Sequence, residues 1–158
     1  MTRLPTLGPR GEGWVALQMV LLVVVAAAGA LGPAWAGSVR VATSAGGVLL
    51  IAAGLTLALL GIRDLRGALT PFPHPRADAD LVETGVYRHA RHPIYGGLVV
   101  AALGWGLLAA SPAALAAAAL LLGFFELKSR REEAWLDQHF EGYAAYRTRT
   151  RRLIPWIG

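Results

Sequence analysis

The side chains best suited to chemistry gather in the segment 85–97, GVYRHARHPIYGG, directly before a long apolar run. Pro93 follows His92, and proline is favoured in the first turn of a helix. Imidazole and guanidinium groups beside a helix N-terminus suit a charged ligand, and glycines let a second surface approach closely. The segment indicates either a ligand pocket or a solvated basic collar. Its polar and aromatic members are Tyr87, Arg88, His89, Arg91, His92 and Tyr95.

A second polar segment, 126–149, follows the apolar run. Its spacing predicts a helix with one apolar stripe, formed by Trp135, Leu136, His139, Phe140 and Tyr143. Lys128 and Glu132 are four residues apart and share a face. Glu126 directly follows two phenylalanines, so we expect Arg130 or Lys128 to pair with it. The plainer alternative is a solvated helix with weak intrahelical ion pairs.

The apolar stretches that must position these segments predict an integral membrane protein. The chain has 158 residues, room for one domain, and is 55% hydrophobic and 16% charged. The runs 13–39 and 41–62 carry no charge and are long enough to cross a membrane as helices. The run 93–125 would form a helix of about 50 Å, too long for one crossing. Ser111 and Pro112 are a typical helix start and divide it into two short arms, 94–110 and 112–125.

The predicted fold class is therefore all-α, with about four transmembrane helices, the last two a short hairpin, and a C-terminal interfacial helix. We expect Trp14 and Trp35 to mark the ends of the first helix, and the apolar tail at 153–156 to be an interfacial anchor. Small residues, among them Gly46, Gly47, Gly54 and Gly61, allow close helix contact. The proline-rich stretch 70–75 must be extended, as a stiff connector or as a wall above a cofactor.

Charge predicts the orientation in the membrane. All 15 lysines and arginines except Arg40 precede the first run, lie in the middle loop or follow Phe125. By the positive-inside rule, both termini and the middle loop are cytoplasmic. The net charge of +5 at pH 7 favours anionic lipid head groups, and so apolar a chain makes nucleic acid an unsuitable partner. The chain has no cysteine, and its first apolar run is too long for a signal peptide, so we expect it to be retained.

The two polar segments flank the same hairpin and emerge on one side of it, so they can enclose one small charged molecule. A carboxylate suits a cationic centre, cations and imidazole suit a carboxylate, and an aromatic face suits a base. S-adenosylmethionine has all three features. The residues alone do not single it out over other small polar ligands.

The order of these motifs resembles the isoprenylcysteine carboxyl methyltransferase family and the related membrane phospholipid methyltransferases. The likeness rests on Gly85-Val86-Tyr87, Arg91-His92-Pro93-x-Tyr95-x-Gly97, Glu132-Glu133-x-x-Leu136 with Phe140, Tyr143 and Tyr146, and a closing Ile154-Pro155, within about 69–155. It implies a membrane methyltransferase that uses S-adenosylmethionine and admits a lipophilic or lipidated acceptor from the bilayer. The chain departs from the pattern at Glu141-Gly142, where the family usually has glycine directly after the phenylalanine.

The resemblance also implies roles for individual positions. The positions implied to bind the cofactor are Leu81, Val82, Tyr87, Arg91, His92, Pro93, Ile94, Tyr95 and Glu132. Lys128 matches a basic position implied to bind the acceptor's carboxylate, and Arg131 could substitute for it. An amine or alcohol acceptor would need a general base, for which His92 or Glu133 could serve. We expect no metal, and a single domain, 1–158, with a helical scaffold at 1–68 and a cofactor-binding part at 69–158.

Two other function classes stay open at this stage. A nicotinamide-dependent membrane reductase can share this membrane architecture, but no G-x-G-x-x-G follows a strand pattern here. A non-enzymatic membrane adaptor or small transporter would not need the polar residues at 87–95 and 132. The identity of the methyl acceptor cannot be predicted from the sequence.

Overall fold

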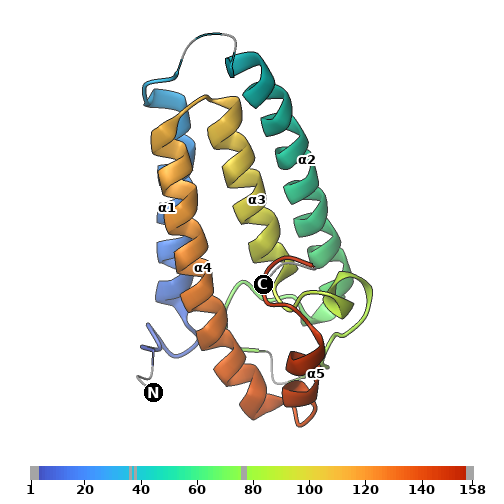
Figure 1. Ribbon diagram of the computed structural model, residues 1–158. Helices are drawn as coiled ribbons and strands as arrows, with labels where there is room; N and C mark the ends of the chain where they lie inside the picture. The colour runs from blue at the N-terminus through green and yellow to red at the C-terminus, as the bar shows by residue number, and fades with distance from the viewer. Residues whose placement is uncertain (1–3, 36, 38, 76–77, 156–158) are drawn as a thin grey trace.

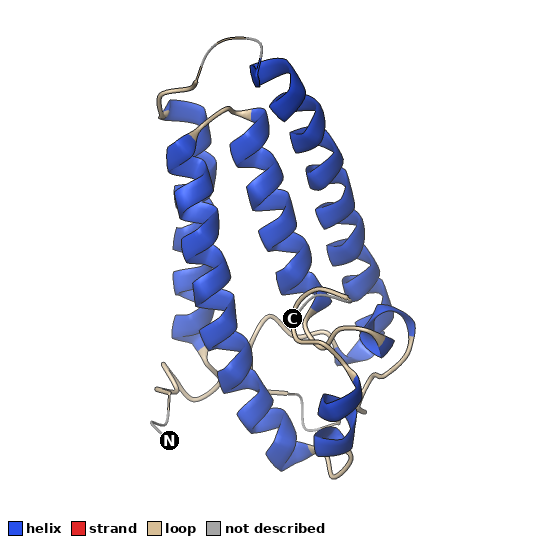
Figure 2. Cartoon of the chain, viewed as in Figure 1, coloured by secondary structure: helices blue, strands red, loops and turns tan. Residues whose placement is uncertain are grey.

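The computed structural model describes residues 4–35, 37, 39–75 and 78–155. It contains α1 (Glu12–Leu31), α2 (Val39–Leu65), α3 (Pro93–Leu108), α4 (Pro112–His139) and α5 (Tyr143–Arg149), with short 3-10 helices at Arg66–Ala68 and Gly85–Arg88. The four long helices form a bundle in which α3 lies between α2 and α4, and α4 packs on α1 (Figure 1). Helices and loops make up the described part of the chain (Figure 2).

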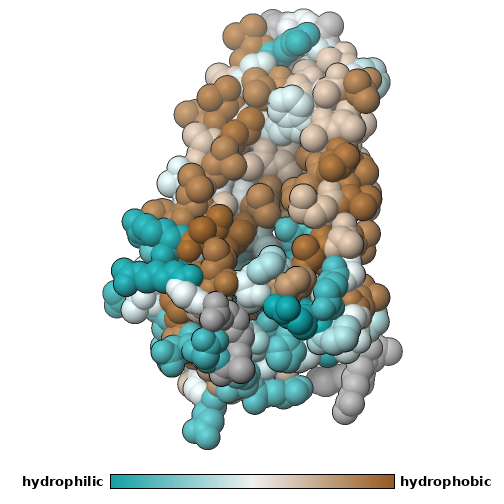
Figure 3. Space-filling view, turned by 180° about the vertical axis from the view of Figure 1, so that it is seen from behind, coloured by the Kyte–Doolittle hydropathy of each residue, from teal (hydrophilic) through white to brown (hydrophobic). Residues whose placement is uncertain are grey.

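Three helices are long and apolar enough to cross a membrane, namely α1, the stretch Arg40–Ala68, which covers α2 except its first residue, and α4. The helix α3 is a shorter apolar helix. Brown, hydrophobic side chains cover the bundle over most of its length, and hydrophilic ones gather at the end where α4 and α5 finish (Figure 3). The prediction of an all-α membrane protein is confirmed.

The predicted hairpin break is confirmed, but its second arm is longer than expected. Ser111 caps α4, since its Oγ accepts a hydrogen bond from the Ala114 N–H at 3.2 Å. The same hydroxyl donates to the Ala28 carbonyl at 2.9 Å and so ties the turn to α1. We expected the arm to end at Phe125 and one further helix to span 126–149, whereas α4 has 28 residues and continues to His139, and a separate helix α5 begins at Tyr143. Ten of the 14 residues at 126–139 are glutamate, leucine, arginine, lysine, alanine or glutamine, which are good helix formers.

Both ends of α1 differ from the prediction. The helix stops at Leu31 because Gly32 and Pro33 follow, so Trp35 lies outside it. Trp14 is not at a lipid interface, because it is only 4% exposed and packs 5.7 Å from the ring of Phe124. Its indole N–H donates to the Pro5 carbonyl at 3.2 Å. The tryptophan therefore anchors the start of α1 to α4.

The close helix contact predicted from glycines lies between α2 and α3. A Cβ on Gly54 would meet the backbone of Gly97 and Ala101 at 2.5 Å, and one on Gly47 would meet Gly104 O at 2.7 Å. Gly46, in contrast, faces open space. Backbones this close gain van der Waals contact, which drives helix association in lipid. We call this close contact between the glycines of α2 and α3 the glycine seam. It fixes the start of α3, where the first polar segment lies.

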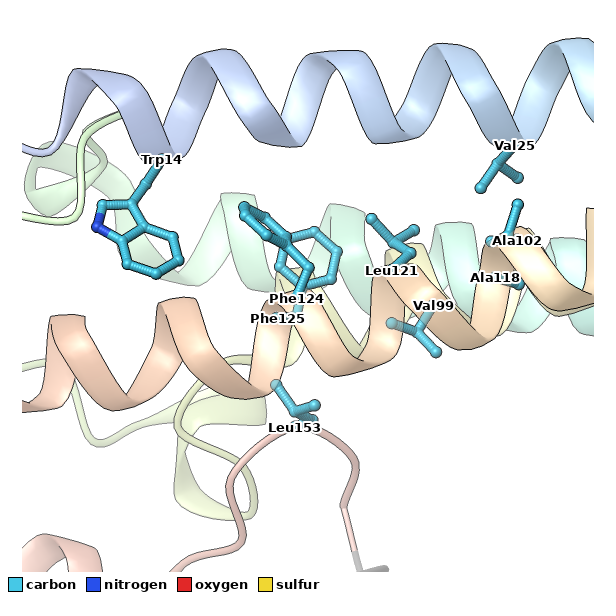
Figure 4. Close-up of a cluster of buried hydrophobic side chains, with 10 residues drawn as sticks. Trp14, Val25, Val99, Ala102, Ala118, Leu121, Phe124, Phe125 and Leu153 are labelled. Carbon is cyan, nitrogen blue, oxygen red and sulfur yellow. The ribbon is translucent and has the colours of Figure 1, made fainter. Parts of the chain in front are cut away.

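The C-terminal strap, residues 150–155, folds back onto the start of α3. Its carbonyls at Arg151 and Arg152 each accept an N–H, from Arg91 and His92 respectively, at 2.8 Å. Leu153, which we expected in an interfacial anchor, is 5% exposed and joins the core cluster of α1, α3 and α4 (Figure 4). Apolar burial therefore outweighs membrane anchoring for this residue. Trp156, from the same predicted anchor, lies outside the described residues.

Candidate functional site

A cavity of about 370 Å³ lies at the polar end of the bundle, a size typical of small-molecule sites. It is bounded by α1, the ends of α2 and α3, the charged half of α4 and the loop between α2 and α3. Its polar and aromatic lining residues are Gln18, Thr70, Phe72, Asp80, Tyr87, Arg91, His92, Tyr95, Lys128, Glu132, Phe140 and Tyr146. The other lining residues are apolar. The polar groups come from different elements and converge on the cavity.

Nearly all of the positions predicted to bind a cofactor line this cavity. They are Leu81, Val82, Tyr87, Arg91, His92, Ile94, Tyr95 and Glu132, with Lys128 beside them. Pro93 is buried in the first turn of α3 and does not line the wall. Arg131 and Glu133 also lie outside the lining. The structure thus brings the two polar segments together around one volume.

His92 and Tyr95 form the side of the cavity nearest α3. The Tyr95 ring is stacked between the His92 imidazole, at 5.5 Å between centroids, and the Phe125 ring, at 4.6 Å. Its hydroxyl donates to Glu132 Oε2 at 2.8 Å, and His92 Nδ1 lies 3.8 Å from the same oxygen. Stacking fixes both rings, so the Glu132 carboxylate is held at a defined point of the wall.

Glu133 binds arginines behind the wall. Its carboxylate accepts a hydrogen bond from Arg91 Nε at 2.8 Å and from Arg152 Nε at 3.3 Å, and it lies 3.4 Å from His92 Nε2. Arg152 also donates to Glu126 at 2.8 Å. Burial alone lowers the pKa of Arg152, but the carboxylates of Glu133 and Glu126 raise it overall, so it stays charged. This network ties the C-terminal strap to the first polar segment.

The prediction that Arg130 or Lys128 pairs with Glu126 is confirmed only for Arg130, and Glu126 has a second partner. Arg130 lies 3.6 Å from Glu126, as the helical spacing indicated. The closer partner is Arg152, at 2.8 Å, from the C-terminal strap. Lys128, the alternative partner, turns toward α1 and donates to Oε1 of Gln18. Its Nζ also lies 4.7 Å from the centroid of the Tyr95 ring.

The proline-rich loop forms one wall of the cavity, so it is more than a connector. Phe72 and Pro73 both line the cavity. Arg10 lies 4.2 Å above the Phe72 ring. Arg131 lies 4.0 Å above the Trp135 ring, so it supports the outer surface of α4.

Tyr87 and Tyr146 close the side of the cavity near α5. The Tyr146 hydroxyl donates to the backbone carbonyl of Tyr87 at 2.7 Å. Burial raises the pKa of both phenols, so both stay neutral and Tyr146 keeps its donor proton. Arg149 also ties α5 to the loop, by an ion pair with Glu83. The cavity wall is therefore braced from the C-terminal side as well.

Several lining residues were missed from the sequence. Gln18 is a polar residue within the first uncharged run, and polar groups at membrane depth often mark function, so a signal existed. Phe140 and Tyr146 were noted only as parts of the apolar stripe and of the resemblance, Phe72 only as part of the proline-rich stretch 70–75, and Asp80 gave no signal. Among residues 4–35, 37, 39–75 and 78–155, no three His, Asp or Glu side chains gather as a metal site requires.

A comparison with protein families gives a match over most of the chain. A family model described as phospholipid methyltransferase matches residues 42–142, which include most of α2 and all of α3 and α4. This group covers the isoprenylcysteine carboxyl methyltransferase-like proteins that the motifs resemble, so that prediction is confirmed. A comparison with curated proteins finds no match.

Proposed function

We propose, since the chain belongs to the phospholipid methyltransferase family, that this membrane methyltransferase moves a methyl group from S-adenosylmethionine to a lipophilic acceptor. The observation that carries the proposal is the shared cavity of the two polar segments, with His92 Nδ1 3.8 Å from Glu132 Oε2. The family match favours this activity over a nicotinamide-dependent reductase or a membrane adaptor.

The lining of the cavity suits S-adenosylmethionine. Glu132 offers a carboxylate for a cationic centre, and Tyr95 holds this carboxylate by a hydrogen bond of 2.8 Å. Phe72, Tyr87 and apolar neighbours such as Leu81 offer surfaces for an adenine. When bound, the sulfonium supplies an electrophilic methyl group with a neutral thioether as leaving group. The cofactor-binding set that we propose is the predicted one, with Pro93 acting through the position of α3.

We assign a separate role to each of the polar residues that surround the reacting groups. Glu132 and His92 orient the cofactor, and the apolar wall excludes water, so orientation and desolvation carry most of the catalysis. Lys128 lies on the wall and is our candidate for binding an acidic group of the acceptor. Glu133 is shared between Arg91 and Arg152 away from the wall, so we propose it as a positioning residue. Arg131 remains a weaker candidate for the acceptor.

The acceptor that best suits these charges is a lipophilic carboxylate. A carboxylate is ionised at neutral pH and attacks without a general base, whereas an amine or alcohol would need His92 to take a proton. The buried ammonium of Lys128 disfavours a second cation near it, because like charges repel strongly in a low-dielectric site. The description of the matched family alone would suggest a phospholipid as the methyl acceptor.

Orientation and domain division belong to the same proposal. The N-terminal loop, the α2–α3 loop and the C-terminal strap all lie at one end of the bundle (Figure 1). We assign this end to the cytoplasm by the positive-inside rule, with Arg40 near the opposite end. The chain 1–158 then forms one domain, in which the scaffold part, 1–68, adds Gln18, Ile62 and Leu65 to the cavity.

A labelled-methyl transfer assay tests the function. Purified protein is incubated with methyl-labelled S-adenosylmethionine and a total membrane lipid extract, and the labelled product is identified by mass spectrometry. We expect a lipid-soluble product that carries a base-labile methyl ester. The matched control is Asp137→Ala, an exposed residue on α4 outside the cavity. No labelled lipid with wild-type protein, across extracts that contain free acids and lipid-modified peptides, would refute the proposal.

A further inference from the structure

The ammonium of Lys128 is buried, and the Glu132 carboxylate acts on it only from beyond ion-pair distance. Its side chain is 1% exposed, and within the described part of the chain it forms no ion pair. Its one hydrogen bond runs to the neutral amide of Gln18, and the Tyr95 ring lies 4.7 Å from Nζ. An ammonium has three donors, so hydrogen-bonding capacity remains at a place where burying a charge is costly.

The arginine and the glutamate that line the cavity already have hydrogen-bond partners. Arg91 donates through Nε to Glu133 and through Nη1 to the carbonyls of Arg147 and Thr150. Glu132 accepts from Tyr95. Lys128 is therefore the lining cation that, among the described residues, is left to meet a ligand.

Gln18 adds a second donor beside this cation. The Gln18 Oε1 accepts a hydrogen bond from the Lys128 ammonium. The Gln18 Nε2 has no hydrogen-bond partner in the described part of the chain. Both residues line the same cavity, Gln18 from α1 and Lys128 from α4. Lysine alone binds a carboxylate as a point charge, without the two parallel donors of an arginine. An amide N–H next to the ammonium supplies the missing second donor.

We propose that Gln18 and Lys128 together form a two-donor site for a ligand carboxylate, with Gln18 as the specificity-determining partner from α1. The inference rests on the proposed function for the ligand, since both S-adenosylmethionine and an acidic acceptor carry a carboxylate. Because α1 precedes the family match at 42–142, selectivity in this chain depends in part on a helix outside the matched region.

Two pairs of probes test the site on purified full-length protein in phosphatidylcholine nanodiscs. One pair is S-adenosylmethionine and its decarboxylated form, and the other is hexadecanoate and hexadecanamide. The variants are Gln18→Met, which keeps the side-chain length, and Gln18→Glu, which places a carboxylate against the ammonium. Met19→Leu is the control, since Met19 is 54% exposed and outside the cavity lining.

We expect Gln18→Met to weaken binding of the carboxylate member of one pair about ten-fold and to leave its carboxylate-free partner unchanged. Gln18→Glu should weaken the same probe further, because its charge repels the ligand. The affected pair identifies the carboxylate as the cofactor's or the acceptor's. Equal affinities in wild type and both variants, or an equal loss within a pair, would overturn the inference. If wild type binds neither form of the cofactor yet still prefers hexadecanoate through Gln18, the proposed function fails and this site stands.

Discussion

His92 Nδ1 lies 3.8 Å from Oε2 of Glu132, and both residues line one cavity although they belong to the beginning of α3 and the charged half of α4. Tyr95 joins them, since its ring stacks on the imidazole and its hydroxyl donates to the same oxygen at 2.8 Å. The two polar segments that flank the hairpin therefore meet around a single cavity.

Replacing Glu132 by glutamine should weaken cofactor binding, whereas the same replacement at Glu133 should lower stability. Glu132→Gln removes the negative charge from the cavity wall, so S-adenosylmethionine binding should weaken at least ten-fold with little change in melting temperature. Glu133→Gln leaves Arg91 and Arg152 without their shared counter-charge, which should lower the free energy of unfolding by about 3 kcal/mol. Calorimetric binding and thermal unfolding measure the two effects. Loss of binding at full stability in Glu133→Gln would speak against its positioning role.

The Tyr95 hydroxyl should matter for the cofactor more than for the fold. Tyr95→Phe keeps the stack between His92 and Phe125 but removes the hydrogen bond that holds Glu132. We expect a several-fold loss of S-adenosylmethionine affinity, since one hydrogen bond to a charged group is worth about 1.5 kcal/mol. Tyr143→Phe is the matched control, because Tyr143 lies outside the cavity lining and its hydroxyl has no hydrogen-bond partner in the described part of the chain. An unchanged affinity in Tyr95→Phe would show that Glu132 needs no such support.

Much of the fold was predictable because the signals were local. Uncharged runs give the helices, and the side-chain chemistry of Ser111 before Pro112 gives the break between α3 and α4. The fate of Leu153 was not predictable, since an apolar residue near a basic tail suits a membrane interface as well as a core. Trp14 was misplaced for the same reason. Only the packing partner decides between the two outcomes.

The candidate site could be predicted in part from the sequence. The residues that were missed reach it through tertiary contacts between distant parts of the chain. The resemblance covers the positions near 81–95 and 132, and the structure gathers them at one cavity, all but Pro93 on its wall. Arg152 could not be assigned, because its pairing with Glu126 and Glu133 depends on the strap folding back over α3. Phe72 joins the wall through a loop whose course no periodicity describes.

The glycine seam between α2 and α3 should be intolerant of a single methyl group. Gly54→Ala would bring a Cβ within 2.5 Å of the Gly97 and Ala101 backbone, so we expect a loss of about 2 kcal/mol in unfolding free energy. Gly46→Ala is the control on the same helix, where the added Cβ meets open space and should be neutral or slightly stabilising. Thermal unfolding in one detergent measures both. Equal melting temperatures for the two variants would contradict the seam.

The strap should contribute to stability through Leu153. Leu153→Ala removes a buried side chain from the core cluster, which should cost about 3 kcal/mol. Leu127→Ala is the control, since Leu127 is 45% exposed on α4. Limited proteolysis after Arg149 should become faster only in the first variant, because loss of the anchor frees the strap. Equal proteolysis of both variants would show that backbone bonds alone hold it.

The central claim is that His92 and Glu132 enclose one S-adenosylmethionine, and equilibrium binding by calorimetry tests it most directly. Wild-type protein and the control Asp137→Ala should bind S-adenosylmethionine with the same affinity, whereas His92→Ala and Glu132→Ala should each lose at least ten-fold. Equal affinity in all four proteins, or no binding by any of them, would contradict the account.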